Sequence, residues 1–361
     1  MRILYALQGT GNGHICRAIE IVPLLKNKAE VDVLISGTQS DIAFPFEVKY
    51  RLDGLSFIFG KNGGVDLLET FRKSQLRKLI REVNQLPVSD YDLVISDFEP
   101  VSSWACYAVN KPCIALSHQA AVTNKKAPRP EKTDQVGRAI LKYYAPATVN
   151  YGFHFAPYNE NIFTPVIRSA VRRATTENHG HYTVYLPSYS DKKIIRILSQ
   201  IEEVQWQVFS KHFEHPLATE NIRVFPLDGT QFIKSMATSS GVLCGAGFET
   251  PAESLYLKKK LMVIPMKNQY EQHCNAAALK ELGVPVIKSL KSRNIDAIRN
   301  WVNSTQLVSV DFPDNTEAIV NQVIDLHAML APVEPQGNNT ELTVKELKGL
   351  TLRKILSKLT S

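Results

Sequence analysis

Short apolar segments alternate with stretches of helical periodicity along the first half of the chain. The apolar segments, rich in β-branched residues, are 3–7, 31–36, 93–96 and 113–117. After the first of them, apolar residues recur at helical spacing at Ile15, Ala18, Ile19, Val22 and Leu25, which predicts a helix with one buried face. Apolar strands joined by such helices are typical of a parallel sheet covered on both faces.

The same alternation of apolar segments and helical stretches starts again in the second half. Its predicted strands are 183–186, 204–209, 222–227, 242–244, 261–265 and 284–287. Residues 157–181 show no strand rhythm and indicate a linker with one short helix around 167–173. We therefore expect an α/β protein with two Rossmann-like, doubly wound parallel-sheet domains, residues 1–160 and 161–330, facing a cleft.

Composition supports two soluble globular domains. The chain has 361 residues, of which 44% are hydrophobic and 21% charged. The apolar start at 3–7 is too short for a signal-peptide core, and the five cysteines show no metal-binding spacing, so we expect a cytoplasmic protein without a metal. The net charge of +7 favours anionic partners, but no motif for binding nucleic acid accompanies it.

A glycine-rich turn follows the first predicted strand, with the sequence GTGNGH at 9–14. It is not a dinucleotide fingerprint, because His14 takes the place of the third glycine and no acidic residue closes the second strand. A P-loop is also excluded, because no Lys-Ser/Thr pair follows. Two interpretations remain open: a tight turn with a capping histidine, or backbone amides of Gly11, Asn12 and Gly13 and the His14 imidazole at the mouth of a site.

A second glycine-containing junction, CGAGFETPAE at 244–253, connects a buried strand to a helix and is followed by EQHCNA at 271–276. Together these motifs resemble the donor-binding region of GT-B glycosyltransferases, both the UDP-glycosyltransferases and the N-acetylglucosaminyltransferase of the peptidoglycan lipid precursor. Taken alone, the four residues TPAE are also a capping box with proline at the first helical position.

The resemblance implies a role for each matching residue. Glu253 would hold the ribose, Phe225 would cover the base, Glu271 and Gln272 would bind the sugar, and Ser188, Thr250 and the Gly247 and Phe248 amides would bind the phosphates. Two positions depart from the pattern. Gly245 stands where relatives place His or Arg, and Glu249 adds negative charge where many have Asn.

The resemblance extends to short motifs in the first half: the turn ending at His14, Ser96-Asp97-Phe98, and Ser117-His118-Gln119. It places His118 on the acceptor side. Each has a plainer alternative, since Asp97 could be an ordinary strand-end carboxylate and His118 a loop or core histidine. The obvious cap of the helix at Pro100 is Glu99.

Taken together, these motifs and the resemblance that they carry imply an inverting, metal-independent glycosyltransferase without a cofactor, which moves a sugar from a nucleotide-diphosphate donor, UDP-sugar first among them, to a hydroxyl acceptor. His14 would be the general base and Asp97 would orient it. One alternative is a nucleotide-sugar 2-epimerase, which shares the fold. Another is a non-catalytic subunit that binds nucleotide-sugar or lipid.

Two basic amphipathic segments, 68–86 and 343–361, raise the question of a membrane partner. Basic residues interleaved with an apolar stripe suit an anionic membrane surface and a lipid acceptor. The alternative is that the stripes pack on the protein's own domains. Residues 332–339 contain two prolines, glycine and asparagine, so we expect 331–361 to be a flexible stretch with a basic tail.

Overall fold

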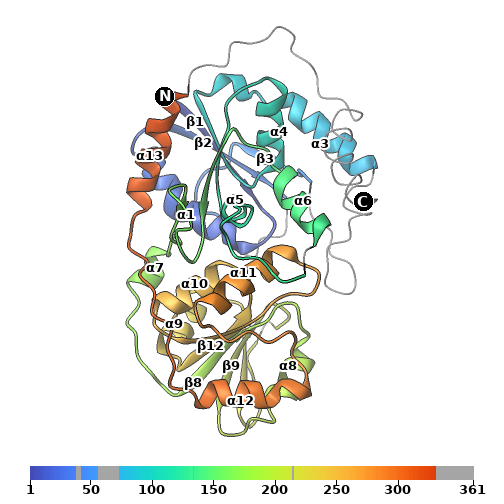
Figure 1. Cartoon of the computed structure of the whole chain (residues 1–361), viewed down its shortest axis with the longest axis vertical. Helices are drawn as coiled ribbons and strands as arrows, with labels where there is room; N and C mark the ends of the chain where they lie inside the picture. Colours follow the sequence, from blue (N-terminus) through green and yellow to red (C-terminus); the bar gives the residue numbers. More distant parts are fainter. Residues whose placement is uncertain (38–41, 56–72, 133, 214, 331–361) are drawn as a thin grey trace. The chain divides into compact units, whose positions relative to one another are not determined.

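The computed structural model describes residues 1–37, 42–55, 73–132, 134–213 and 215–330 (Figure 1). These residues fold into two compact units. Unit 1 contains the described residues of Met1–Ala127, of Lys132–Val166 and of 313–330, and unit 2 contains Pro128–Glu131 and the described residues of Ile167–Phe312.

Unit 1 is built on a parallel sheet that has seven strands within the described residues, in the order β3-β2-β1-β4-β5-β6-β7. The strands are β1 Arg2–Gln8, β2 Glu30–Ser36, β3 Tyr50–Leu52, β4 Leu93–Asp97, β5 Ile114–Ser117, β6 Val149–Phe153 and β7 Ile162–Phe163. The helices are α1 Asn12–Lys26, α3 Lys73–Gln85, α4 Pro100–Ala108, α5 His118–Val122, α6 Gln135–Tyr143 and α13 Thr316–Met329, with a 3₁₀ turn, η1, at Val88–Asp90.

The alternation of side chains along β1 sorts these helices between the two faces of the sheet. Leu4 and Ala6 belong to a core cluster with buried residues of α3 and α4. The neighbouring residues Ile3, Tyr5 and Leu7 are also fully buried and point to the opposite face, where α1 packs on β1 and α13 packs on α1 (Figure 1). The central strands are therefore covered on both sides, as their continuous apolar sequences predict.

Helix α13 lies in a different unit from the one the sequence predicts. Residues 316–329 were expected in the second domain, yet α13 packs on α1 of unit 1. Its buried residues Ile319, Val320 and Val323 form an apolar face. Helical periodicity predicts such a face but not the sheet that it covers.

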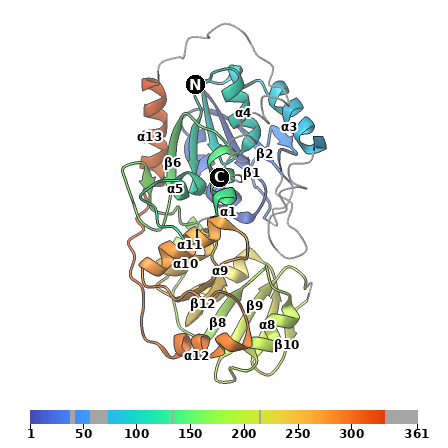
Figure 2. The same cartoon turned by 45° about the vertical axis from the view of Figure 1, so that its right-hand side comes forward.

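Unit 2 contains the second sheet, with the strand order β10-β11-β9-β8-β12-β13 (Figure 2). The strands are β8 His181–Tyr185, β9 Gln205–Ser210, β10 Leu217–Ala218, β11 Ile222–Pro226, β12 Gly241–Gly245 and β13 Lys260–Ile264, of which β10 is antiparallel to β11. The helices are α7 Ser169–Arg172, α8 Asp191–Leu198, α9 Gly229–Thr238, α10 Glu249–Tyr256, α11 Tyr270–Glu281 and α12 Ile295–Asn303, with a 3₁₀ turn, η2, at Ser292–Asn294.

Two predictions about elements need correction. The expected strand at 284–287 is reduced to an isolated bridge between Val286 and Val263, so it does not extend the sheet. The expected linker 157–181 contains the short helix predicted, as α7, and also β7, which pairs with β6 at the edge of the first sheet. A two-residue strand is too short to produce a periodic pattern.

The apolar stripe of α3 packs inside unit 1. Leu76, Leu79, Ile80 and Val83 are buried in the cluster that contains Leu4 and α4. For the described part of segment 68–86, packing on the protein's own domain is therefore confirmed. Residues 68–72 and the basic tail 343–361 lie outside the described residues. Within the described ranges, none of the helices combines the length and apolar character needed to cross a bilayer.

Candidate functional site

The glycine turn brings the start of α1 against the carboxyl ends of β1 and β2. The Gly9 amide donates a 2.6 Å hydrogen bond to the Ser36 carbonyl, and a Cβ on Gly9 would stand 2.7 Å from the Gly37 carbonyl oxygen. Gly11 precedes α1 with φ of 93°, in the left-handed region that glycine tolerates best. This turn places His14 in the first turn of α1, near the strand ends.

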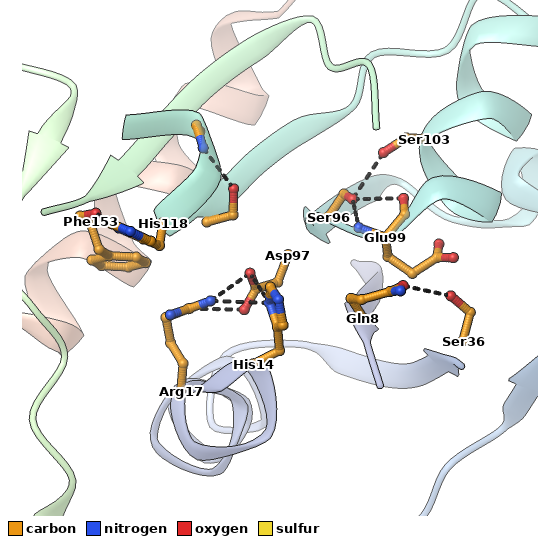
Figure 3. A network of polar contacts seen from close by, with 12 residues as sticks. Gln8, His14, Arg17, Ser36, Ser96, Asp97, Glu99, Ser103, His118 and Phe153 are labelled. Carbon is orange, nitrogen blue, oxygen red and sulfur yellow. Dashed lines mark hydrogen bonds and ion pairs between the residues drawn. The ribbon is translucent and has the colours of Figure 1, made fainter. Parts of the chain in front are cut away.

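His14 and Asp97 meet across this strand end (Figure 3). Asp97 is the last residue of β4 and aligns with Leu7 of β1. His14 Nδ1 lies 2.9 Å from Asp97 Oδ1, and the two residues are 8% and 0% exposed. The pairing that the sequence predicts from two distant motifs is therefore present in the geometry.

The charge of Asp97 fixes the tautomer of His14. Burial alone would raise the pKa of the Asp97 carboxyl, but Arg17 and His14 hold it below its usual value, so Asp97 is ionised. A carboxylate can only accept a hydrogen bond, so the His14 Nδ1 must carry the hydrogen of the 2.9 Å contact. The lone pair of neutral His14 is then on Nε2, the arrangement that a general base requires.

Arg17 completes this cluster, and the motifs do not predict it. Its Nε donates to Asp97 Oδ2 at 2.9 Å and its terminal nitrogen donates to Asp97 Oδ1 at 2.8 Å. Arg17 is only 2% exposed, and its guanidinium lies over the Phe153 ring. One signal was available in the sequence: Arg17 follows His14 by three positions, so both side chains share one face of α1.

A second buried network lies beside this cluster, at the ends of β1, β2 and β4 (Figure 3). Gln8 Nε2 donates to the Tyr144 hydroxyl at 3.0 Å and Ser36 donates to Gln8 Oε1 at 3.2 Å. Glu99 accepts the Val101 and Ser102 amides at 2.7 and 2.6 Å, which confirms it as the cap of α4. Burial raises the pKa of Glu99 despite these donors.

His118 is 1% exposed, and its Nδ1 donates to the Phe153 carbonyl at 2.8 Å. Its ring packs edge to face with His154, whose pKa is lowered well below the usual value by burial and by His118. The preceding residue, Ser117, caps α5 by accepting the Ala120 amide. These contacts are those of a buried core histidine. Contact of His118 with an acceptor stays a prediction.

In unit 2, the residues predicted for the donor gather at the carboxyl edge of the sheet, because β8, β11, β12 and β13 are parallel. Ser188 is exposed after β8, Gly247 and Phe248 connect β12 to α10, and Thr250 lies in the first turn of α10. Phe225 is half-buried at the end of β11, stacked on Phe209 with ring centroids 5.5 Å apart. Glu271 and Gln272 lie in the first turn of α11, after β13.

The capping-box alternative for TPAE is wrong. Helix α10 begins at Glu249 with Phe248 as its N-cap, so Thr250 and Pro251 lie inside the first turn. Glu253 is 2% exposed, and its carboxylate instead accepts two hydrogen bonds from Arg168, from Nε to Oε1 at 2.6 Å and from a terminal nitrogen to Oε2 at 2.7 Å. Any contact of Glu253 with a ribose would share the carboxylate with Arg168.

The motif at 271–276 holds two loops in place through side-chain amides. Gln272 Oε1 accepts the Met266 amide at 2.8 Å, and Asn275, fully buried, donates to the Ala246 carbonyl at 3.1 Å. Gln272 therefore has a structural contact besides its predicted contact with the sugar. Among the described residues, no group of three or more His, Cys, Asp or Glu side chains is placed to bind a metal ion.

Comparison with known proteins identifies the family of the chain and the fold that it shares with solved structures. Residues 1–305 match the model of glycosyl transferase family 1. The chain belongs to this family. No curated protein sequence matches it.

Solved structures share the fold at low sequence identity. Phytolacca americana UGT2, complexed with UDP-2fluoro-glucose and pterostilbene, has a TM-score of 0.55 and 14% identity, covering 99% of this chain and 98% of its own. Acinetobacter baumannii MurG has a TM-score of 0.52 and 14% identity, with coverage of 91% and 99%. A UDP-N-acetylglucosamine 2-epimerase also has a TM-score of 0.52, with 13% identity and coverage of 91% and 97%. The predicted GT-B fold is confirmed.

Proposed function

We propose that this glycosyl transferase family 1 chain transfers a sugar, with inversion, from a nucleotide-diphosphate donor to a hydroxyl acceptor, and that UDP-sugar is the preferred donor. The observation that carries the proposal is the buried contact of 2.9 Å between His14 Nδ1 and Asp97 Oδ1. It leaves Nε2 of a neutral imidazole to act as base, which is what activation of a hydroxyl group requires.

Unit 1 supplies the proton transfer. His14 Nε2 removes the proton as the acceptor oxygen attacks the anomeric carbon of the sugar, and the bond from that carbon to the diphosphate oxygen breaks. The ionised Asp97 stabilises the imidazolium that forms. A single displacement of this kind inverts the anomeric configuration.

Unit 2 supplies the donor contacts. Amides of Gly247, Phe248 and Thr250 at the N-terminus of α10 receive the charge of the leaving diphosphate, which removes the need for a metal ion. Apart from Gly247 and its two neighbours in the chain, no described residue comes within 4 Å of the point where a Cβ on Gly247 would stand, so this loop leaves room for a phosphate. Ser188 adds a phosphate contact, Phe225 covers the base, Glu253 holds the ribose, and Glu271 and Gln272 bind the sugar.

The acceptor is a hydroxyl compound, and we include lipids among the candidates because of the basic tail 343–361. On this proposal, the Gly11 to Gly13 turn and His118 lie on the acceptor side, and the enzyme works in the cytoplasm, at or near the anionic inner face of the membrane.

A panel of nucleotide-sugars, each incubated with soluble and lipid-linked hydroxyl acceptors, tests the proposal. We expect release of free nucleotide diphosphate together with a glycosylated acceptor of inverted configuration. His14→Gln should lower turnover by roughly 10² to 10⁴ while donor affinity stays the same. The exposed His215 provides the matched control, because His215→Gln removes an imidazole elsewhere on the surface.

Three outcomes would contradict the proposal. An epimerised nucleotide-sugar without free diphosphate would indicate a 2-epimerase. Donor binding without turnover across the whole acceptor panel would indicate a non-catalytic binding subunit. Full turnover by His14→Gln would remove His14 from the reaction.

A further inference from the structure

We propose that Arg17 is a positioning residue that keeps His14 in the Nδ1-protonated tautomer, in which Nε2 can act as base. This inference rests on the proposed function of His14. It concerns a residue that touches neither donor nor acceptor and acts through Asp97.

The geometry of the Asp97 carboxylate carries the inference. Arg17 engages both of its oxygens, at 2.9 Å to Oδ2 and 2.8 Å to Oδ1, and His14 Nδ1 lies 2.9 Å from the same Oδ1. The planar fork of arginine matches a carboxylate at two points and so fixes its rotation. With the carboxylate fixed, Oδ1 stays directed at His14, and Nδ1 rather than Nε2 keeps the hydrogen.

The other groups around the cluster do not replace Arg17. Tyr5 of β1 lies close enough to Asp97 for the two to interact electrostatically; burial and then the Asp97 charge raise the pKa of this phenol well above its usual value, so it stays neutral. On the side of β6, the Phe153 ring covers the guanidinium, and beyond it lie His118 and His154, the latter held neutral by its lowered pKa. Among the described residues, Arg17 is thus the cation that Asp97 binds.

Two variants separate positioning from simple stabilisation. Arg17→Met keeps an unbranched side chain but removes both the positive charge and the planar guanidinium that binds both oxygens of Asp97. Arg17→Lys keeps the positive charge but removes the planar guanidinium. We expect both variants to lower kcat by roughly 10-fold or more while the KM for the donor stays near wild type, because neither fixes the rotation of Asp97 that directs Oδ1 at His14. Arg138, exposed on α6, supplies the control Arg138→Met, for which kcat should not change.

A second measurement, of the ring tautomer of His14, does not depend on catalytic turnover. With ¹⁵N-labelled histidine, NMR distinguishes the two ring tautomers, and His14→Gln identifies the His14 signals among the nine histidines. We expect the neutral imidazole of His14 to be Nδ1-protonated in the wild-type protein and to become a mixture of the two tautomers in Arg17→Met. If Arg17→Met does not fold, Arg17→Lys should still show a mixture of tautomers.

The inference is overturned if folded Arg17→Met, or Arg17→Lys where only that variant folds, keeps the wild-type tautomer; Arg17 would then be purely structural. If the tautomer changes as expected while the wild-type protein transfers no sugar, the proposed function fails and the inference about Arg17 stands.

Discussion

At the scale of single residues, two buried ion pairs link the candidate sites to the stability of their units. Asp97 pairs with Arg17 and Glu253 pairs with Arg168, and both carboxylates are almost completely buried. Removing one partner of such a pair leaves a buried charge uncompensated and costs about 3–5 kcal/mol. A loss of activity in a variant of either carboxylate therefore has two possible causes.

Glu253 can be tested with a pair of variants that break the same ion pair. Glu253→Gln removes the charge predicted to hold the ribose, whereas Arg168→Met removes only the partner. We expect both to lower the melting temperature, and only Glu253→Gln to weaken donor binding, by roughly 10- to 100-fold, because a hydrogen bond to a charged group is lost. Calorimetric titration with the donor, run beside thermal unfolding, makes the comparison.

Equal weakening of donor affinity in both variants would show that Glu253 acts by shaping the loop rather than by holding the ribose. Unchanged donor affinity in Glu253→Gln, together with a lower melting temperature, would show that the Glu253 carboxylate stabilises the protein by binding Arg168 and does not bind the donor.

Motifs in the sequence predict candidate site residues such as Glu253 and His14, but they do not predict the arginines that bind the buried carboxylates. Glu253 and His14 stand out by spacing from glycines and strand ends, which are local properties of the chain. Arg168 and Arg17 lie 85 and 80 positions from the carboxylates they bind. Neither periodicity nor composition predicts such a contact, since it depends on how distant elements pack.

At the scale of elements, the long apolar strands are predictable and the short ones are not. The runs at 3–7 and 31–36 become β1 and β2 because a buried parallel strand needs apolar side chains on both faces. Strands of two or three residues, such as β7 and β3, arise where a neighbouring edge offers hydrogen bonds. The junctions between strands and helices decide where functional residues lie, and the glycine turn from β1 to α1 is one example.

Gly9→Ala tests this junction. The added Cβ would stand 2.7 Å from the Gly37 carbonyl oxygen and 2.9 Å from Ile35 Cγ2, so backbone must move to make room. We expect a loss of about 1–3 kcal/mol in the free energy of unfolding, measured with urea. Gly229, the first residue of α9, is the control, because its added Cβ would meet no described atom within 4 Å apart from its chain neighbours and the backbone of its own helix. A Gly9 variant as stable as the Gly229→Ala variant would show that the turn relaxes freely.

At the scale of the whole molecule, a surplus of positive charge is combined with two basic segments of the sequence, 68–86 and 343–361. The net charge is +7, and the structure buries the apolar stripe of α3 in unit 1, where it is unavailable to lipid. Arg77 and Arg81 of α3 remain exposed. If the protein binds an anionic membrane, the basic tail 343–361 is then the segment that can supply both charge and apolar side chains.

Binding to lipid vesicles distinguishes these two segments. We expect the full chain to sediment with anionic vesicles and not with neutral ones, and less so in high salt, because the attraction is screened. Truncation after Ala331 removes the five basic residues Lys345, Lys348, Arg353, Lys354 and Lys358, each worth about 1 kcal/mol near an anionic surface, and should abolish binding. Arg77→Gln combined with Arg81→Gln removes two exposed charges from α3 and should weaken binding only slightly. Equal binding to both vesicle types, or binding that survives the truncation, would contradict the role of the tail and favour a soluble acceptor.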